Sequence, residues 1–285
     1  MKPASFEYFA PRSVDEAVAL LGEHGGEARV LAGGQSLVPA MNFRLARPAV
    51  LVDINGIAGI AGVREEGETL SIGALTRHAV FEQPVASGPL GSLLPAVARH
   101  IAHLPIRRRG TFGGSVAHAD PSAEWCTLAL ALDAEIVVRS TQAERRISAR
   151  DWFKSIFTTD IRDGEMVTEI RLPRLGAEWR CSFIEFSRRA GDFAMVSALA
   201  AVRTENGIIG EARLALGGVV DKPVRAEGAE ALLVGATPGD AVFRAAAEAA
   251  RAAFEPFGDI HATAEYKSEL IAVMTRRALE RAVAP

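Results

Sequence analysis

The chain has 285 residues, of which 49% are apolar and 24% charged, and its formal net charge is −3. This composition is typical of a globular protein of about two domains, and it excludes the basic surface that binds nucleic acid or anionic lipid. No apolar run reaches the ~18 residues of a membrane span, and the start, MKPASFEYFAPRS, lacks the apolar stretch of a signal peptide. We therefore expect a cytoplasmic protein without a membrane span. Its two cysteines cannot supply the four usual ligands of an iron–sulfur cluster.

The first part of the chain carries both helix and strand signals. Ser13 and Glu16 form a capping box, and apolar residues follow at helical spacing as far as His24. Apolar patterns predict the following further elements: strands over residues 29–31, 51–54 and 70–74, helices over 90–103 and 122–132, a hairpin of 135–138 with 145–147, and a strand over 166–172.

The pattern changes after residues 174–178, RLGAE, which we expect to be a domain boundary. Beyond it, strands are expected over residues 181–187, 196–203 and 211–217, followed by helices over 224–234, 239–254 and 263–282. The pair Asn206-Gly207 tolerates positive φ and predicts a hairpin turn. This part is therefore expected to be a small sheet covered by helices.

Two stretches share a pattern: residues 29–37 read RVLAGGQSL and residues 109–118 read RGTFGGSVAH. Either Gly-Gly pair alone is better explained as a strand end that needs positive φ. Glycine also lets backbone N–H groups approach an oxyanion, and Ser36, Thr111 and Ser115 can donate hydroxyls to it. Taken together, the two stretches predict two walls around one ligand that carries a diphosphate.

Other kinds of site fit the sequence less well. Asp53 stands where the ribose-binding acid of a Rossmann site is expected, but AGGQS is not G-x-G-x-x-G, and Pro39 interrupts the crossover helix. The spacing of His100, His103 and His118 is not that of a familiar zinc site, so no metal site is predicted. Neither glycine stretch has the G-x-S-x-G pattern of a hydrolase. A flavin fits best, because it supplies its own redox chemistry.

Four motifs extend this interpretation to a family. The segments LAGGQSLVPAMNFRLARPAVLVDIN, IRRRGTFGGSVAHADPSAE, FSRRAGDFAMVS and AEYKSELIAVMTRRAL resemble the FAD-binding medium subunit of the molybdenum hydroxylase (xanthine dehydrogenase and aerobic carbon monoxide dehydrogenase) family, over the whole chain. The resemblance implies an α+β fold. Residues 1–175 would form an FAD-binding PCMH-type (vanillyl-alcohol-oxidase-like) domain of two subdomains, about 1–55 and 56–175. Residues 179–285 would form a C-terminal α+β domain like that of the carbon monoxide dehydrogenase flavoprotein.

The resemblance also implies a set of FAD contacts, with each glycine motif wrapping the pyrophosphate from one side, and no catalytic residue. The implied cofactor-binding residues are Leu31, Ala32, Gly33, Gly34, Gln35, Ser36, Leu37, Ile101, Ala102, Gly110, Thr111, Gly113, Gly114, Ser115, Asp120, Glu124, Ile161, Val167, Glu185 and Phe193.

Several of these residues have particular implied roles. Glu124 would bind the adenosine ribose, at a position where relatives often have Asp. Ile101, Ala102 and Val167 would contact the isoalloxazine ring; from the residues alone, Ile101 and Val167 are better explained as core packing, and so is Phe193. Glu185 stands where relatives carry Lys or Gln, and Phe193 stands where one relative has Tyr.

Finally, the resemblance implies cofactors and partners. FAD would be bound non-covalently. A small subunit would carry [2Fe–2S] clusters and a large subunit the molybdenum cofactor, in a dimer of heterotrimers. The chain would pass electrons from the clusters to an external acceptor. The alternative is a stand-alone FAD oxidase or reductase of the same fold, acting on its own small-molecule substrate, with a larger substrate-binding cap in its C-terminal domain.

Overall fold

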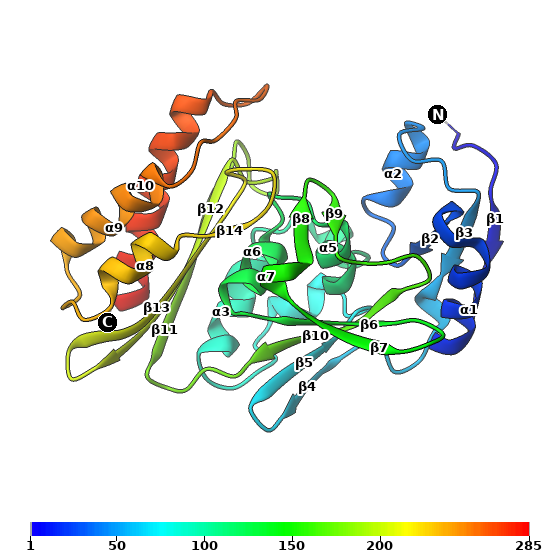
Figure 1. The fold of residues 1–285 in the computed structure, drawn as a ribbon, viewed down its shortest axis with the longest axis horizontal. Coiled ribbons are helices and arrows are strands. Elements are labelled where there is room, and N and C mark those ends of the chain that lie inside the picture. The colour runs from blue at the N-terminus through cyan, green and yellow to red at the C-terminus, as the bar shows by residue number, and fades with distance from the viewer. Residues whose placement is uncertain (1, 285) are drawn as a thin grey trace.

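Three units of mixed helix and strand lie in a row in the computed structural model, which describes residues 2–284 (Figure 1). The N-terminal unit has a parallel sheet in the order β1-β3-β2. Its elements are β1 (Glu7–Phe9), α1 (Val14–His24), η1 (Gly25–Glu27), β2 (Ala28–Leu31), α2 (Leu37–Asn42), β3 (Val50–Asp53) and η2 (Ile54–Gly56). Ser13 caps α1 as predicted, because its side chain accepts the N–H of Glu16. The Glu16 carboxylate in turn accepts the N–H of Arg12 at 2.7 Å.

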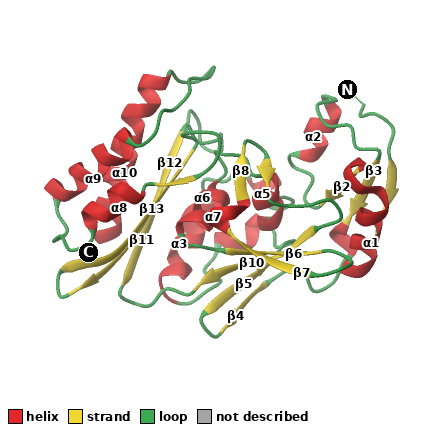
Figure 2. Ribbon diagram, in the orientation of Figure 1, coloured by secondary structure: helices red, strands yellow, loops and turns green. Residues whose placement is uncertain are grey.

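The middle unit is an antiparallel sheet in the order β4-β5-β10-β6-β7, with helices packed on it (Figure 2). Its strands are β4 (Val63–Glu66), β5 (Thr69–Gly73), β6 (Glu135–Arg139), β7 (Glu144–Ser148) and β10 (Met166–Pro173), with the small hairpin β8 (Phe153–Ser155) and β9 (Thr158–Thr159). Its helices are η3 (His78–Glu82), α3 (Gly88–Ala98), α4 (Leu104–Arg107), α5 (Phe112–His118), α6 (Glu124–Ala131) and α7 (Ala149–Trp152).

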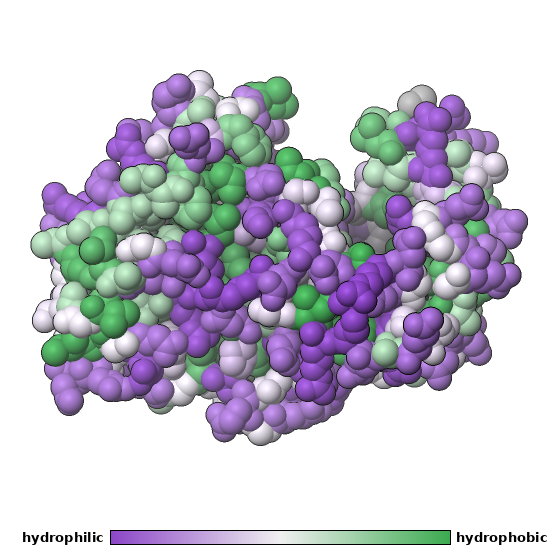
Figure 3. All heavy atoms as spheres, in the orientation of Figure 1, coloured by the Kyte–Doolittle hydropathy of each residue, from purple (hydrophilic) through white to green (hydrophobic). Residues whose placement is uncertain are grey.

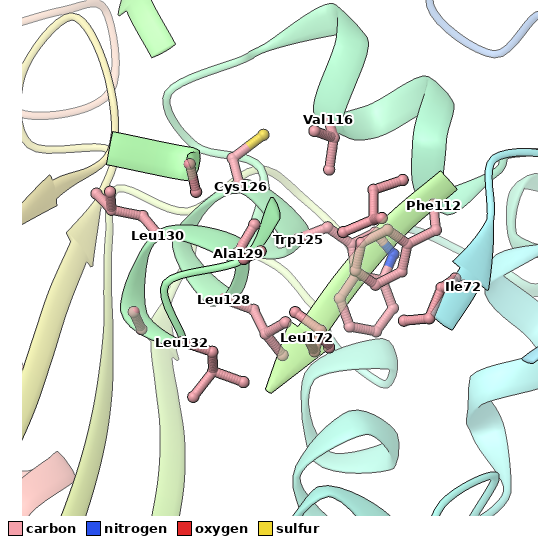
Figure 4. Close-up of a cluster of buried hydrophobic side chains, with 14 of the residues drawn as sticks. Ile72, Phe112, Val116, Trp125, Cys126, Leu128, Ala129, Leu130, Leu132 and Leu172 are labelled. Atoms are coloured by element: carbon pink, nitrogen blue, oxygen red, sulfur yellow. The ribbon is translucent and has the colours of Figure 1, made fainter. Parts of the chain in front are cut away.

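An aromatic cluster fixes α5 against α6 in the core of this unit (Figure 4). Phe112 of α5 stacks on Trp125 of α6 with ring centroids 4.5 Å apart, and Phe81 meets the edge of Trp125. All three side chains are fully buried. Since such rings bury large apolar areas and pack with defined geometry, this cluster sets where the first turn of α5 lies.

The C-terminal unit is an antiparallel sheet, β11-β12-β13-β14, with three helices on one face (Figure 1). Its elements are β11 (Trp179–Phe186), β12 (Val196–Glu205), β13 (Ile208–Gly217), β14 (Val224–Arg225), α8 (Glu227–Leu233), α9 (Asp240–Ala252) and α10 (Ala264–Val283). The predicted hairpin turn is confirmed: Asn206 has φ 52° and Gly207 has φ 78°. The other face contacts the middle unit, where the Gly218 N–H donates to the Pro121 carbonyl at 2.8 Å.

Two predicted helices have different bounds. The helix expected over residues 90–103 ends at Ala98, because the chain then turns through Ala102, whose φ is 41°. The helix expected to begin at residue 224 begins at Glu227, because residues 224–225 pair with β13 as strand β14. The expected boundary at 174–178 falls in the link between β10 and β11. Every helix within residues 2–284 is too short or too polar to cross a bilayer.

Candidate functional site

The first glycine motif forms the loop between β2 and α2. Gly34 has φ +71°, a conformation that strongly favours glycine. The Gln35 side chain donates to the Gly33 carbonyl at 3.0 Å and holds the loop's shape. Within residues 2–284, no acceptor is found for the backbone N–H groups of residues 33–37. A run of unpaired amides of this kind can bind an anion.

The second glycine motif differs from the prediction, because it is the first turn of helix α5 and not a strand-end turn. Thr111 is the N-cap, and its Oγ1 accepts the Gly114 N–H at 3.0 Å. The N–H groups of Phe112, Gly113 and Ser115 also have protein acceptors, the carbonyls of Thr76, Ala74 and Thr111. Of residues 110–115, only Thr111 has a backbone N–H for which no acceptor is found within residues 2–284. The second motif therefore offers mainly the hydroxyls of Thr111 and Ser115, while most of the free amides lie in the first loop.

Glycine is required at one position of each motif, because another backbone segment packs directly against it. A Cβ on Gly33 would overlap the carbonyl oxygen of Arg109 and lie 2.6 Å from the Cα of Gly110. A Cβ on Gly113 would lie 2.6 Å from the Cα of Ala74, at the end of β5. The predicted juxtaposition of the two motifs is thus present in the fold. The surface is notched between the lobe that carries α2 and the middle of the molecule (Figure 3), on the side where α5 and the β8–β9 hairpin lie (Figure 1).

A buried histidine supports the backbone between the motifs. The Trp125 indole N–H donates to His78 Nδ1 at 3.0 Å, and a Cβ on Gly110 would lie 2.7 Å from the His78 ring. Burial, with the nearby charges of Arg77 and Arg107, lowers the pKa of His78 to about 4. The ring is therefore neutral at physiological pH, as an acceptor of the indole N–H must be.

A second group of predicted residues meets at the loop after α3. Arg107 donates to the carbonyls of Ile101 and Ala102, both at 2.8 Å, and pairs with Glu82 at 2.6 Å. The loop between β11 and β12 reaches the same place, because a Cβ on Gly191 would lie 2.8 Å from the Ala102 carbonyl oxygen. The C-terminal sheet therefore contributes directly to this part of the site.

Two carboxyl groups are buried, one at the start of α6 and one on β11. Glu124 is 5% exposed, and the side chain of Glu185 is 1% exposed. No hydrogen-bond partner is found for Glu185 Oε2 within residues 2–284, and its Oε1 lies 3.9 Å from His100 Nδ1. Burial raises the pKa of both carboxyls, and the charge of Glu124 raises that of Glu185 further. Burial lowers the pKa of His100, so it does not serve as a permanent counter-ion.

Known proteins match this sequence along nearly its whole length. Residues 4–175 match the family model described as the FAD binding domain in molybdopterin dehydrogenase, and residues 181–282 match the CO dehydrogenase flavoprotein C-terminal domain. The chain belongs to this FAD-binding family. The predicted family and the α+β fold class are both confirmed.

Two relatives and one solved structure illustrate the extent of the match. The 6-hydroxypseudooxynicotine dehydrogenase complex subunit alpha of Paenarthrobacter nicotinovorans is 40% identical over 99% of this chain and 96% of that protein. The carbon monoxide dehydrogenase medium chain of Hydrogenophaga pseudoflava is 37% identical over 99% of this chain and 98% of that protein. A solved structure of carbon monoxide dehydrogenase from H. pseudoflava superposes with a TM-score of 0.96 at 39% identity, covering 99% of this chain and 98% of that one.

The remaining residues predicted for this FAD-binding chain lie in varied surroundings. Val167 is 5% exposed, on β10 where the pairing with β6 shifts register, whereas Phe193 is 63% exposed and Ile161 is 38% exposed. Asp120 accepts the Ser122 N–H at 2.9 Å in the turn before α6. Glu124 is predicted to bind the ribose and Glu185 to lie near the flavin ring, and both assignments remain predictions.

Sequence reasoning missed two polar residues between the glycine motifs, Asn55 and Arg77. Asn55 follows the predicted strand over residues 51–54, so its place at a strand end was readable from the pattern. Arg77 stands in a segment with no motif, and its contacts join parts of the chain that are distant in sequence.

Proposed function

We propose that the chain is the FAD-carrying electron-transfer subunit of a heterotrimeric molybdenum hydroxylase, which passes electrons from the [2Fe–2S] clusters of a partner subunit to an external acceptor. The observation that carries the proposal is the run of unpaired amides at residues 33–37 packed beside the start of α5. This arrangement stands in a chain that medium chains of dehydrogenases match over nearly their whole length. FAD, when bound, would supply the redox chemistry.

The residues present fit the cofactor. The amides of residues 33–37 would hold the diphosphate, with the hydroxyls of Thr111 and Ser115 on the other side. The glycines leave no side chain between the two walls, because a Cβ on Gly33 would fill the space between them. Around these we place Leu31, Ala32, Gly110, Asp120 and Ile161, and toward the isoalloxazine Ile101, Ala102, Val167, Phe193 and the unpaired carboxyl of Glu185. Glu124 would bind the adenosine ribose.

We further propose the partners that the resemblance implies: a small subunit with [2Fe–2S] clusters, a large subunit with the molybdenum cofactor, and a dimer of heterotrimers in the cytoplasm. The relatives support an assembly, since they are named as a complex subunit and as medium chains. The alternative, a stand-alone FAD oxidase or reductase, needs a substrate-binding cap. Here one face of the C-terminal sheet is covered by α8, α9 and α10, and the other contacts the middle unit, an arrangement that favours the subunit.

Purified protein should carry one FAD that acid precipitation releases completely into the supernatant. Covalent attachment through sulfur needs an accessible thiolate. Cys126 is fully buried, and burial raises its pKa well above the usual value, while burial raises the pKa of Cys181 to about 12. The double variant Cys126→Ala, Cys181→Ala is the control and should retain its yellow colour. Flavin that stays in the pellet, or FMN in place of FAD, would contradict the proposal.

A further inference from the structure

Four side chains form a hydrogen-bonded chain from the N-terminal sheet to the start of α5, and none of them belongs to either glycine motif. Tyr8 of β1 donates to Asp53 Oδ2 at 2.5 Å. Asp53 Oδ1 accepts both the backbone N–H and the side-chain amide of Asn55, at 2.9 and 2.6 Å. Arg77 donates to Asn55 Oδ1 at 2.5 Å and also to the carbonyl of Arg109.

This chain holds one carbonyl from each wall of the site. Asn55 Nδ2 donates to the carbonyl of Ala32, at the start of the first loop, at 2.8 Å. Arg77 donates to the Arg109 carbonyl, the group that closely packs against Gly33. An unpaired carbonyl oxygen carries partial negative charge and repels a neighbouring anion. Pairing both carbonyls therefore reduces the negative charge that an anion would meet beside the amides of residues 33–37.

Arg77 also brings a positive charge that no direct ion pair cancels. No carboxylate of residues 2–284 forms an ion pair with Arg77 within 4.0 Å, and its nearest acidic group in this network, Asp53, is reached only through Asn55. Burial and the neighbouring charge of Arg109 lower the pKa of Arg77. A dianionic ligand beside the first loop would relieve this unfavourable surplus of positive charge.

We propose that Asn55 and Arg77 form a clasp that sets the spacing between the first loop and α5, and that Arg77 is a positioning residue for the diphosphate of FAD. The inference rests on the proposed function, since it assumes FAD in this site. A bifurcating guanidinium suits the task because it donates to two acceptors in a fixed geometry, which a lysine cannot do. The clasp joins four segments: the first loop at Ala32, η2 after β3, the residue before η3 and the loop before α5.

The test is a titration of FAD into the full-length chain freed of flavin. Binding is measured by the quenching of FAD fluorescence. Arg77→Met should weaken FAD binding by roughly 10- to 100-fold, the effect of losing hydrogen bonds from a charged group. Arg77→Lys should recover only part of this loss. Arg64→Met is the matched control, since Arg64 pairs with Glu66 and Glu169 at the edge of the middle sheet, and it should bind FAD like the wild type.

A double variant tests whether Asn55 and Arg77 act as one unit or independently. If Asn55 and Arg77 act as one unit, Asn55→Ala combined with Arg77→Met should lose little more affinity than Arg77→Met alone. The loss in Arg77→Met should also shrink at high salt, which a purely structural role would not cause. If Arg77→Met does not fold, Arg77→Lys and Asn55→Ala carry the same comparison.

Failure of the clasp and failure of the proposed function give different results. Wild-type affinity in Arg77→Met, or fully additive losses in the double variant, would overturn the clasp while the FAD site itself stands. A wild-type chain that does not bind FAD would instead overturn the proposed function, and the clasp with it.

Discussion

Replacing Gly33 with alanine is expected to abolish FAD binding and to lower the free energy of unfolding by about 1–3 kcal/mol. The added Cβ would overlap the Arg109 carbonyl oxygen and lie 2.6 Å from the Cα of Gly110. Both are backbone atoms of the opposite wall, so the clash cannot be relieved by rotating a side chain. The two walls must move apart, and the diphosphate site is lost with them. Flavin content of the purified variant and its denaturant unfolding curve measure the two effects.

Alanine substitutions at two other glycines serve as comparisons for Gly33→Ala. Gly114→Ala should lose less affinity, because its Cβ would meet the Thr111 hydroxyl oxygen at 2.7 Å, and a side chain can shift. Gly22→Ala, in α1 where nothing lies within 4 Å of the added Cβ, should stabilise the protein by about 0.5–1 kcal/mol and leave FAD binding unchanged. Full flavin occupancy in Gly33→Ala would show that the walls are not in contact as described.

The flavin-free protein should lose stability as the pH rises, and Glu185→Gln should remove much of that loss. Burial and the charge of Glu124 raise the pKa of Glu185 in the folded state. The folded state therefore favours the protonated carboxyl. Below the unfolded-state pKa of about 4.3, both states are protonated and the group has no effect. As the pH rises toward the folded-state pKa, the unfolded state releases its proton first and stability falls.

Glutamine keeps the shape of the carboxyl and cannot ionise. Glu185→Gln should therefore match the wild type near pH 4 and exceed it by roughly 1–3 kcal/mol near pH 8, because each unit by which the folded-state pKa is raised is worth about 1.4 kcal/mol once the unfolded state has ionised. Denaturant unfolding at a series of pH values measures this difference. Glu23→Gln, on the exposed face of α1, is the control and should follow the wild type at every pH. If Glu185→Gln also follows the wild type throughout, the carboxyl is not held protonated in the fold.

Local signals in the sequence were sufficient for many elements. The Ser13 cap, the Asn206-Gly207 turn and the strand at residues 50–53 depend on neighbours a few residues away, and each was predicted closely. The second glycine motif was misread because glycine is a poor helix former. Glycine nevertheless stands in the first turn of α5, because the helix packs so closely against Ala74 that a residue with a Cβ does not fit at position 113. Such tertiary contacts are not visible in a single sequence.

The site was predictable only in part, because it too depends on tertiary contacts. The two glycine motifs were identified, and the fold brings them into contact, but which of them keeps free amides depends on the acceptors around α5. The clasp joins residues 55, 77 and 109, which no sequence spacing links. The interaction of Glu124 with Glu185 likewise arises only when the C-terminal sheet packs against α6.

In the proposed function this chain receives electrons from partner subunits and oxidises no organic substrate itself. The most direct measurement is the visible absorbance of its flavin after anaerobic mixing with the substrate of its complex, with and without the iron–sulfur and molybdenum subunits. Rapid bleaching is expected only when both partners are present. Rapid bleaching of the isolated chain by the substrate would contradict it and would favour a stand-alone oxidase.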